Sequence, residues 1–109
     1  MPTTYKVLGQ SNPAATTATT LYTVPSATQA IVSTITAANT SATAATYRIA
    51  VRPAGAALAA QHYVAYDITA SPNDTVALTL GITLGATDVI TVYASTANMV
   101  FHVYGSEIA

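Results

Sequence analysis

Two runs of alternating apolar and polar residues, separated by a loop with a proline and a glycine, most constrain how this chain can fold. The first run covers residues 47–52 (Tyr-Arg-Ile-Ala-Val-Arg), and the second covers residues 62–68 (His-Tyr-Val-Ala-Tyr-Asp-Ile). Pro53 and Gly55 lie in the loop between them. Period-two runs on either side of such a connection are typical of a β-hairpin with a long loop. The sequence therefore predicts a hairpin over residues 47–68.

One register of this hairpin gives each face a consistent character. When Ile49 is paired with Tyr66, six large side chains share one face, which we expect to be buried: Tyr47, Ile49, Val51, Val64, Tyr66 and Ile68. On the other face, Arg48 then lies directly opposite Asp67. A shift by one residue would move the apolar side chains to the opposite face and separate the two charges. We therefore predict that Arg48 and Asp67 form a structural cross-strand pair, which fixes the register more than it stabilises the fold.

Charged side chains are too scarce for several classes of function. The chain of 109 residues has three basic and four acidic side chains and a net charge of −1. This balance gives no electrostatic footprint for binding nucleic acid. Alanine and threonine make up well over a third of the sequence, so few large side chains remain to build a core at this length. We therefore expect further burial of apolar surface against neighbouring subunits.

Neither disulfides nor a membrane segment are expected. The chain contains no cysteine, which excludes a disulfide framework and thiolate metal ligands. Polar residues interrupt every apolar run well before the ~18 residues that a membrane-spanning helix needs. The first residues also lack the apolar run of a signal peptide. We expect no membrane partner.

Short segments with strand character recur along the rest of the chain. They are spaced by roughly 8–12 residues and separated by turn signals, of which Ser71-Pro72-Asn73-Asp74 is the strongest. No segment has the period of an amphipathic helix, and residues 54–60 are the one place for a helical turn. The sequence therefore predicts an all-β fold: an antiparallel β-sandwich of eight or nine short strands, with a jelly-roll or similar topology.

The first 20 residues differ from the rest. After a short strand-like run at residues 5–8, the chain continues as Ser11-Asn12-Pro13 and an alanine- and threonine-rich tract to Thr20, with no periodicity. We therefore predict an N-terminal arm or linker at residues 1–20 and a β-sandwich domain at residues 21–109. Residues 10–20 are expected to lack regular secondary structure, and to be mobile or to lie on a neighbouring subunit.

A second hairpin is predicted near the end of the chain, from residues 88–94 and 99–105. Its four-residue loop, Ser95-Thr96-Ala97-Asn98, sets a register in which six residues form an apolar face toward the core: Ile90, Val92, Ala94, Met99, Phe101 and Val103. The opposite face then carries tyrosine, valine and histidine side chains without any charge: Val89, Tyr93, Val100, His102 and Tyr104. Such a face is typical of a protein interface. We predict that these five residues form an oligomer interface, the alternative being that a loop or the N-terminal arm of the same chain covers them.

No pattern in the sequence indicates catalysis. The acidic residues are Asp67, Asp74, Asp88 and Glu107; Asp67 has its predicted partner, and Asp74 and Asp88 stand where turns favour them. His62 and His102 share no ligand spacing with a third group. Exposed tyrosines also suit a sugar-binding platform, but such a site normally has hydrogen-bonding residues beside the ring, and these are scarce in the sequence. We therefore predict a protein that is not an enzyme, with no catalytic, cofactor-binding or metal-binding residues.

Three longer stretches resemble a known group of proteins. They are Leu-Tyr-Thr-Val-Pro-Ser-Ala-Thr-Gln-Ala-Ile-Val-Ser from residue 21, the two hairpin strands with their loop, and Leu-Gly-Ile-Thr-Leu-Gly-Ala-Thr-Asp-Val-Ile-Thr-Val-Tyr-Ala-Ser from residue 80. Together they resemble small β-rich accessory virion proteins of tailed bacteriophages, including those of cyanophages. The likeness spans about residues 21–107. It implies a virion protein without an active site, which decorates or cements the capsid, often as a trimer at local three-fold positions, or belongs to the tail.

The expectations for function follow from this resemblance together with the scarcity of charge. We expect a capsid decoration or cement protein, located in the virion, that forms a homo-oligomer (a trimer) and bridges neighbouring shell subunits. Its partners would be further copies of itself and the major capsid protein or a tail protein, with no cofactor, nucleic acid or membrane. The alternative is a tail-fibre, spike or baseplate component with receptor or glycan binding.

Overall fold

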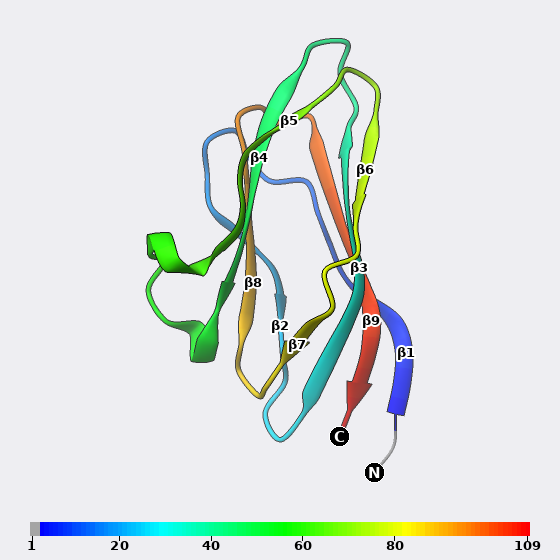
Figure 1. Cartoon of the computed structure of the whole chain (residues 1–109), viewed down its shortest axis with the longest axis vertical. Helices are drawn as coiled ribbons and strands as arrows, with labels where there is room; N and C mark the ends of the chain where they lie inside the picture. The colour runs from blue at the N-terminus through cyan, green and yellow to red at the C-terminus, as the bar shows by residue number, and fades with distance from the viewer. Residues whose placement is uncertain (1–2) are drawn as a thin grey trace.

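The computed structural model describes residues 3–109, which form two antiparallel sheets packed face to face (Figure 1). The strands are β1 (Thr3–Ser11), β2 (Thr19–Thr23), β3 (Gln29–Asn39), β4 (Ala45–Arg52), β5 (Tyr63–Ala70), β6 (Thr75–Leu78), β7 (Ile82–Leu84), β8 (Val89–Ala94) and β9 (Met99–Ile108). Two short 3-10 turns, η1 (Pro53–Gly55) and η2 (Ala60–His62), lie in the connection between β4 and β5. The predicted all-β sandwich is confirmed.

The order of the strands is that of a jelly roll. Sheet A has the order β1-β9-β3-β6, with β7 also paired to β3, and sheet B has the order β2-β8-β4-β5. Because β6 and β7 both pair with β3, they are two parts of one strand position, interrupted at Gly81, whose φ is +64°. The chain passes from one sheet to the other at every connection except β4–β5 and the β6–β7 break. Eight strand positions in two four-stranded sheets, linked in this way, define the jelly roll that the sequence predicts.

The core lies between the two sheets and is built from alternate residues of the inner strands. Its largest fully buried side chains come from both sheets: Tyr47, Ile49, Ile90 and Val92 from sheet B, and Val32, Ile35, Met99, Phe101 and Val103 from sheet A. The rings of Tyr47 and Phe101 meet edge to face across the core, with their centroids 6.0 Å apart. The Tyr47 hydroxyl is buried without a hydrogen-bond partner, and burial raises its pKa.

The predicted boundary between an arm at residues 1–20 and a domain at residues 21–109 is wrong. β1 pairs with β9 along its whole length, so it is an edge strand of sheet A. Residues 12–18 are irregular, but they lie on their own chain: the Asn12 side-chain amide donates to the Met99 carbonyl at 2.7 Å, and Pro13 is buried. The Thr16 N–H also donates to the Ala94 carbonyl at 2.8 Å. The N-terminal segment is therefore part of the sandwich.

The first predicted hairpin is confirmed as β4–β5, but its register is only partly correct. Tyr47 pairs with Ile68 as predicted, and Arg48 forms an ion pair with Asp67. Beyond that point two register shifts pair Ile49 with Ala65 and Ala50 with Tyr63, and Asp67 has a positive φ of +51°. Bulges of this kind re-aim the side chains that follow them.

The bulges overturn part of the predicted buried face. Tyr47 and Ile49 are fully buried, and Val51 is half-buried. Three of the six predicted residues, Val64, Tyr66 and Ile68, are instead 47%, 54% and 43% exposed. The small side chains of Ala65 and Ala70 take the core-facing places on β5. Because β5 is the edge strand of sheet B, its large side chains also have no neighbouring strand on one side.

The predicted C-terminal hairpin is also wrong. β8 lies in sheet B between β2 and β4, whereas β9 lies in sheet A between β1 and β3. The connection through residues 95–98 therefore crosses from one sheet to the other, and the two strands pack face to face instead of side by side. The predicted core residues are correct, since all six are fully buried: Ile90, Val92, Ala94, Met99, Phe101 and Val103. Their cross-strand partners differ from those in the predicted register: Ile90 pairs with Val51, and Val103 pairs with Ile35.

Candidate functional site

The outer face of sheet B carries an arginine held between two tyrosine rings. The guanidinium carbon of Arg48 lies 4.2 Å from the centre of the Tyr66 ring and 4.3 Å from the centre of the Tyr93 ring. Its Nε donates a hydrogen bond of 2.7 Å to Oδ1 of Asp67, which raises the pKa of Arg48. These four residues, which we call the Arg48 cluster, come from β4, β5 and β8. Cation–π contacts and an ion pair thus fix one side chain from three directions.

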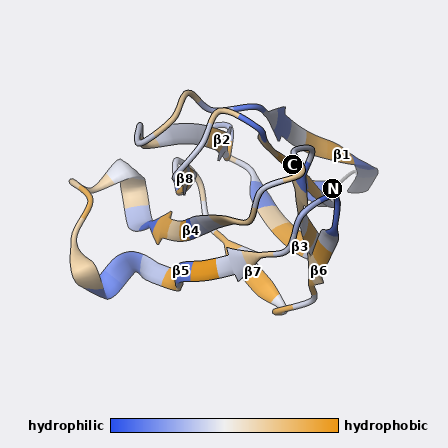
Figure 2. Cartoon of the chain, turned by 90° about the horizontal axis from the view of Figure 1, so that it is seen from above, coloured by the Kyte–Doolittle hydropathy of each residue, from blue (hydrophilic) through white to orange (hydrophobic). Residues whose placement is uncertain are grey.

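A hollow lies beside this cluster, between β5 and the β4–β5 connection. It has a volume of about 580 Å³ and is lined by Leu58, Ala59, Ala60, Tyr63 and Tyr66. The centroids of the Tyr63 and Tyr66 rings are 4.9 Å apart, and their planes stand at 78°. We call this feature the tyrosine hollow. Its position follows from the connection standing away from sheet B, as Figures 1 and 2 show.

Hydrogen bonds within the β4–β5 connection and to the residues beside it fix the segment that forms one wall of the tyrosine hollow. The Asp88 carboxylate accepts from the Ala54 N–H and from the Gly85 N–H, both at 2.8 Å. Arg52 donates to the Ala56 carbonyl at 3.1 Å and to the Thr91 hydroxyl at 3.0 Å. At the other end of the segment, the Nδ1 atom of buried His62 accepts from the Ala59 N–H. His62 and Asp88 therefore have structural roles here.

A second surface lies over sheet A, near the two chain ends. Tyr5 and Val7 of β1 and Ile31 of β3 are 83%, 47% and 44% exposed. A shallow hollow of about 360 Å³ lies among Tyr5, Lys6, Ile31, Ser33 and Tyr104. Nearby, Nδ1 of His102 lies 2.8 Å from the Tyr104 hydroxyl. This surface is mainly apolar, with a hydrogen-bonded rim.

Lys6, Glu107 and Tyr22 link the first, last and second strands. Lys6 Nζ lies 2.8 Å from one carboxylate oxygen of Glu107, and the Tyr22 hydroxyl donates to the other at 2.5 Å. The hydrogen bond from Lys6, and then that from Tyr22, lower the pKa of Glu107. Burial, followed by the bond to Glu107, raises the pKa of Tyr22. All three charged or polar groups satisfy one another, so we assign this triad a structural role.

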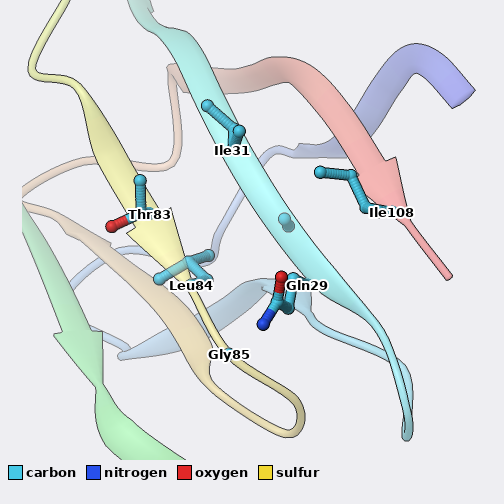
Figure 3. Close-up of a pocket in the computed structure, with 7 residues that line it drawn as sticks. Gln29, Ile31, Thr83, Leu84, Gly85 and Ile108 are labelled. Carbon is cyan, nitrogen blue, oxygen red and sulfur yellow. The ribbon is translucent and has the colours of Figure 1, made fainter. Parts of the chain in front are cut away.

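A third hollow, of about 350 Å³, lies where β3, β7 and the end of β9 approach each other (Figure 3). Gln29 and Thr83 supply its polar side chains, and the remaining lining residues are Ala30, Ile31, Leu84, Gly85 and Ile108. No ionisable side chain lines this hollow. Its residues offer neither an acid–base pair nor a ligand set for a metal.

The five residues predicted to form one oligomer interface do not share a surface. Val89 and Tyr93 belong to sheet B, while Val100, His102 and Tyr104 belong to sheet A. The outward sides of these strands therefore point to opposite sides of the sandwich. Val89 is only 7% exposed, and its position next to Gly55 shows that the β4–β5 connection covers it. A single interface built from the two strands is excluded by this geometry.

The tyrosine hollow is the feature that sequence reasoning missed. Tyr63 and Tyr66 are three residues apart and would point to opposite faces of a regular strand. The bulges in β5 bring their rings together, and no residue pattern in the chain signals those bulges. Among residues 3–109, no group of three histidine or acidic side chains could hold a metal ion. The described part of the chain also has no helix of the length and apolarity needed to cross a membrane.

Comparison with known proteins finds no protein-family model, no curated protein and no solved structure that matches this chain. The function is therefore inferred from the fold and from the surfaces described above.

Proposed function

We propose that this chain is a structural protein of a phage virion, a capsid decoration or cement protein that forms a homotrimer and bridges neighbouring shell subunits. One observation carries the proposal. The two opposite edges of the sandwich expose large apolar side chains, and they have no free charge that would hinder pairing with a strand of another chain. β1 ends sheet A on one side and β5 ends sheet B on the other, as the order of strands and Figure 2 indicate.

Each edge exposes apolar side chains, and one valine at each edge is exposed to the same extent. Val7 on β1 and Val64 on β5 are each 47% exposed, and Tyr5 and Ile68 extend the two edges. Edge strands present unpaired backbone groups, and soluble monomers usually protect them with charged side chains or proline. Here the edge charges are already engaged, Lys6 by Glu107 and Asp67 by Arg48. Both edges are therefore suited to contact with another chain.

A contact between β1 of one copy and β5 of the next would use two different surfaces of the same chain. Contacts of this type close into a ring when the rotation between copies allows it. A trimer is the ring that the resemblance of residues 21–107 to phage accessory proteins favours. The jelly roll also occurs in viral capsid domains, which supports the proposal by analogy of fold alone. In a shell, many identical copies would strengthen each weak contact through avidity.

The number of copies per particle tests this proposal. Particles of the phage that encodes the chain would be purified, and the protein quantified by mass spectrometry against the major capsid protein. Hundreds of copies are expected for a decoration protein. A small multiple of three or six would instead support the second candidate, a tail-fibre, spike or baseplate component. Absence from purified particles would contradict both.

A further inference from the structure

We propose that the tyrosine hollow binds a neutral carbohydrate, with the rings of Tyr63 and Tyr66 as its apolar surfaces and the Arg48–Asp67 pair as its polar edge. This inference goes beyond the structural role proposed above. It concerns the side of β5 that faces the β4–β5 connection, whereas the proposed contact between copies uses the unpaired backbone edge of the same strand.

The two tyrosines supply surfaces that suit a sugar ring. A pyranose has C–H groups on its faces and hydroxyl groups around its edge, so it stacks on an aromatic ring and forms hydrogen bonds at its rim. The planes of Tyr63 and Tyr66 stand at 78° with centroids 4.9 Å apart. The two rings touch edge to face, and Arg48 lies over one face of Tyr66, so a sugar would stack on a ring face that these contacts leave open. Tyr66 is 54% exposed, which leaves much of its surface open to a ligand.

The polar groups beside the rings match the hydroxyls of a sugar. Asp67 accepts from Arg48, yet its side chain remains 45% exposed, so its carboxylate has lone pairs left for sugar hydroxyls. Arg48 bonds Asp67 through Nε and Nη2, and the guanidinium has further N–H donors. Because the two charges balance each other, the pair favours a neutral ligand over an anionic one. The sequence shows few such groups near any tyrosine, but the fold collects them at this one.

The site is formed before any ligand binds. Arg48 is fixed by two rings and a carboxylate, and the opposite wall is held by Asp88 and Arg52. Asp67 has a positive φ of +51° and bonds Arg48 from a bulge in the β4–β5 pairing. Strained or bulged residues of this kind are common at binding sites. A rigid site loses little conformational entropy on binding. This helps a ligand that makes few strong contacts, such as a sugar, to bind.

The size and shape of the hollow favour a small ligand over a flat protein contact. Its volume of about 580 Å³ lies within the range of small-molecule sites, roughly 300–1,000 Å³. Leu58 and the alanines beside it form the wall opposite the tyrosines. The residues that line the hollow are apolar except for the two tyrosine hydroxyls. Arg48 and Asp67 lie beside it, with Arg48 against the ring of Tyr66, an arrangement that fits one or two sugar units.

Nuclear magnetic resonance on the full chain tests the proposal. The ¹⁵N-labelled protein would be titrated with maltotriose, cellotriose, mannotriose, chitotriose and lactose, each to about 10 mM, which detects dissociation constants in the millimolar range. Sialyllactose serves as the anionic comparison. At least one neutral sugar is expected to shift the amide signals of residues 58–60, Tyr63 and Tyr66. No shift with any neutral sugar, shifts confined to another surface, or binding of sialyllactose alone would overturn the proposal.

Variants then identify the stacking residues. Tyr66→Ala is expected to weaken the affinity about tenfold or more, while Tyr104→Ala, at a tyrosine on β9 in the other sheet, leaves it unchanged. Leu58→Asp tests the opposite wall and is expected to weaken binding as well. The amide spectrum of each variant reports whether it is folded. If a variant does not fold, the amide shifts of the unmodified protein during the sugar titration still show whether the tyrosine hollow is the binding site. Unchanged affinity in Tyr66→Ala would contradict the proposal. It would also be contradicted if the unmodified protein bound no sugar and Tyr66→Ala formed a smaller oligomer, because Tyr66 would then belong to a contact between copies.

Discussion

Arg48 Nε lies 2.7 Å from Asp67 Oδ1, across a hairpin in which Asp67 has a positive φ of +51°. The ion pair therefore exists at a bulge and not in a regular ladder. A non-glycine residue in this region of φ is strained, but aspartate and asparagine tolerate it better than most residues do. The residue at position 67 therefore combines two properties, a negative charge and tolerance of the left-handed backbone conformation.

Two substitutions at Asp67 separate these properties. Asp67→Asn removes the charge and keeps the tolerance, while Asp67→Val removes both. Because an exposed ion pair contributes little, we expect Asp67→Asn to lower the melting temperature only slightly. Asp67→Val should cost a further 1–3 kcal/mol, on the order of the strain at such positions. Equal stabilities of the two variants in urea unfolding would contradict a role for the backbone conformation.

Tyr47 provides a prediction about the core. Its side chain is fully buried, and its hydroxyl has no hydrogen-bond partner. An unpaired buried hydroxyl costs about 1–3 kcal/mol, so Tyr47→Phe should raise the free energy of unfolding by about 1 kcal/mol while keeping the edge contact with Phe101. Tyr47→Ala, which leaves a cavity, should lower it by roughly 3–5 kcal/mol. A clear loss of stability in Tyr47→Phe would show that the hydroxyl has a partner.

Gly105 allows close approach between two central strands of sheet A. A Cβ atom at this position would lie 2.0 Å from the Ile31 carbonyl oxygen and 3.0 Å from the Val32 Cα. Both contacts are with backbone, which cannot move aside without disturbing the β3–β9 pairing. We expect Gly105→Ala to cost roughly 3 kcal/mol or more in urea unfolding.

Gly85→Ala is the matched control for this substitution. The nearest atom to a Cβ there is Asp88 Oδ2, at 3.7 Å, which is an ordinary contact. This variant should change stability by less than about 1 kcal/mol. Similar losses in both variants would mean that the close approach of β3 and β9 is not what excludes a side chain at Gly105.

Glu107 makes the stability of the folded protein depend on pH in the acidic range. Its pKa is lowered from the ordinary value of 4.5, first by the hydrogen bond from Lys6 and then by that from Tyr22. A carboxylate with a lowered pKa in the folded state stabilises the fold fully above its unfolded pKa, and this stability is lost as the pH falls through the folded pKa. The melting temperature should therefore fall more steeply below about pH 4.5 in the unmodified protein than in Glu107→Gln. Parallel curves for the two proteins would contradict the role of the triad.

The sequence predicts the fold well and its connections less well. The alternation of apolar and polar residues predicts the all-β class, the β4–β5 hairpin and the Arg48–Asp67 pair, because these features depend on residues close together in the chain. The four-residue connection after β8 fits either a hairpin or a crossing between sheets. The choice depends on distant contacts, such as the bonds from the Asn12 side chain to the Ala97 and Met99 carbonyls.

The two remaining errors have related causes. β1 lies at an edge and is mostly exposed, so it shows little of the alternation that marks a half-buried strand. The tyrosine hollow depends on bulges in β5, which move Tyr66 out of the predicted buried face. A bulge depends on how the strand fits its neighbours and on the strain that the fold can tolerate, and neither can be read from the alternation of residues.

Molar mass in solution, measured by light scattering, tests the contact between the two edges most directly. The 11.1 kDa chain is expected to form a trimer. Val7→Asp and Val64→Asp place the same charge at two equally exposed valines on opposite edges, and because one contact uses both edges, each substitution alone should give a folded monomer. Ala42→Asp, at an exposed residue between β3 and β4, should leave the trimer intact. A monomeric unmodified protein, or a trimer that persists in both valine variants, would contradict the account.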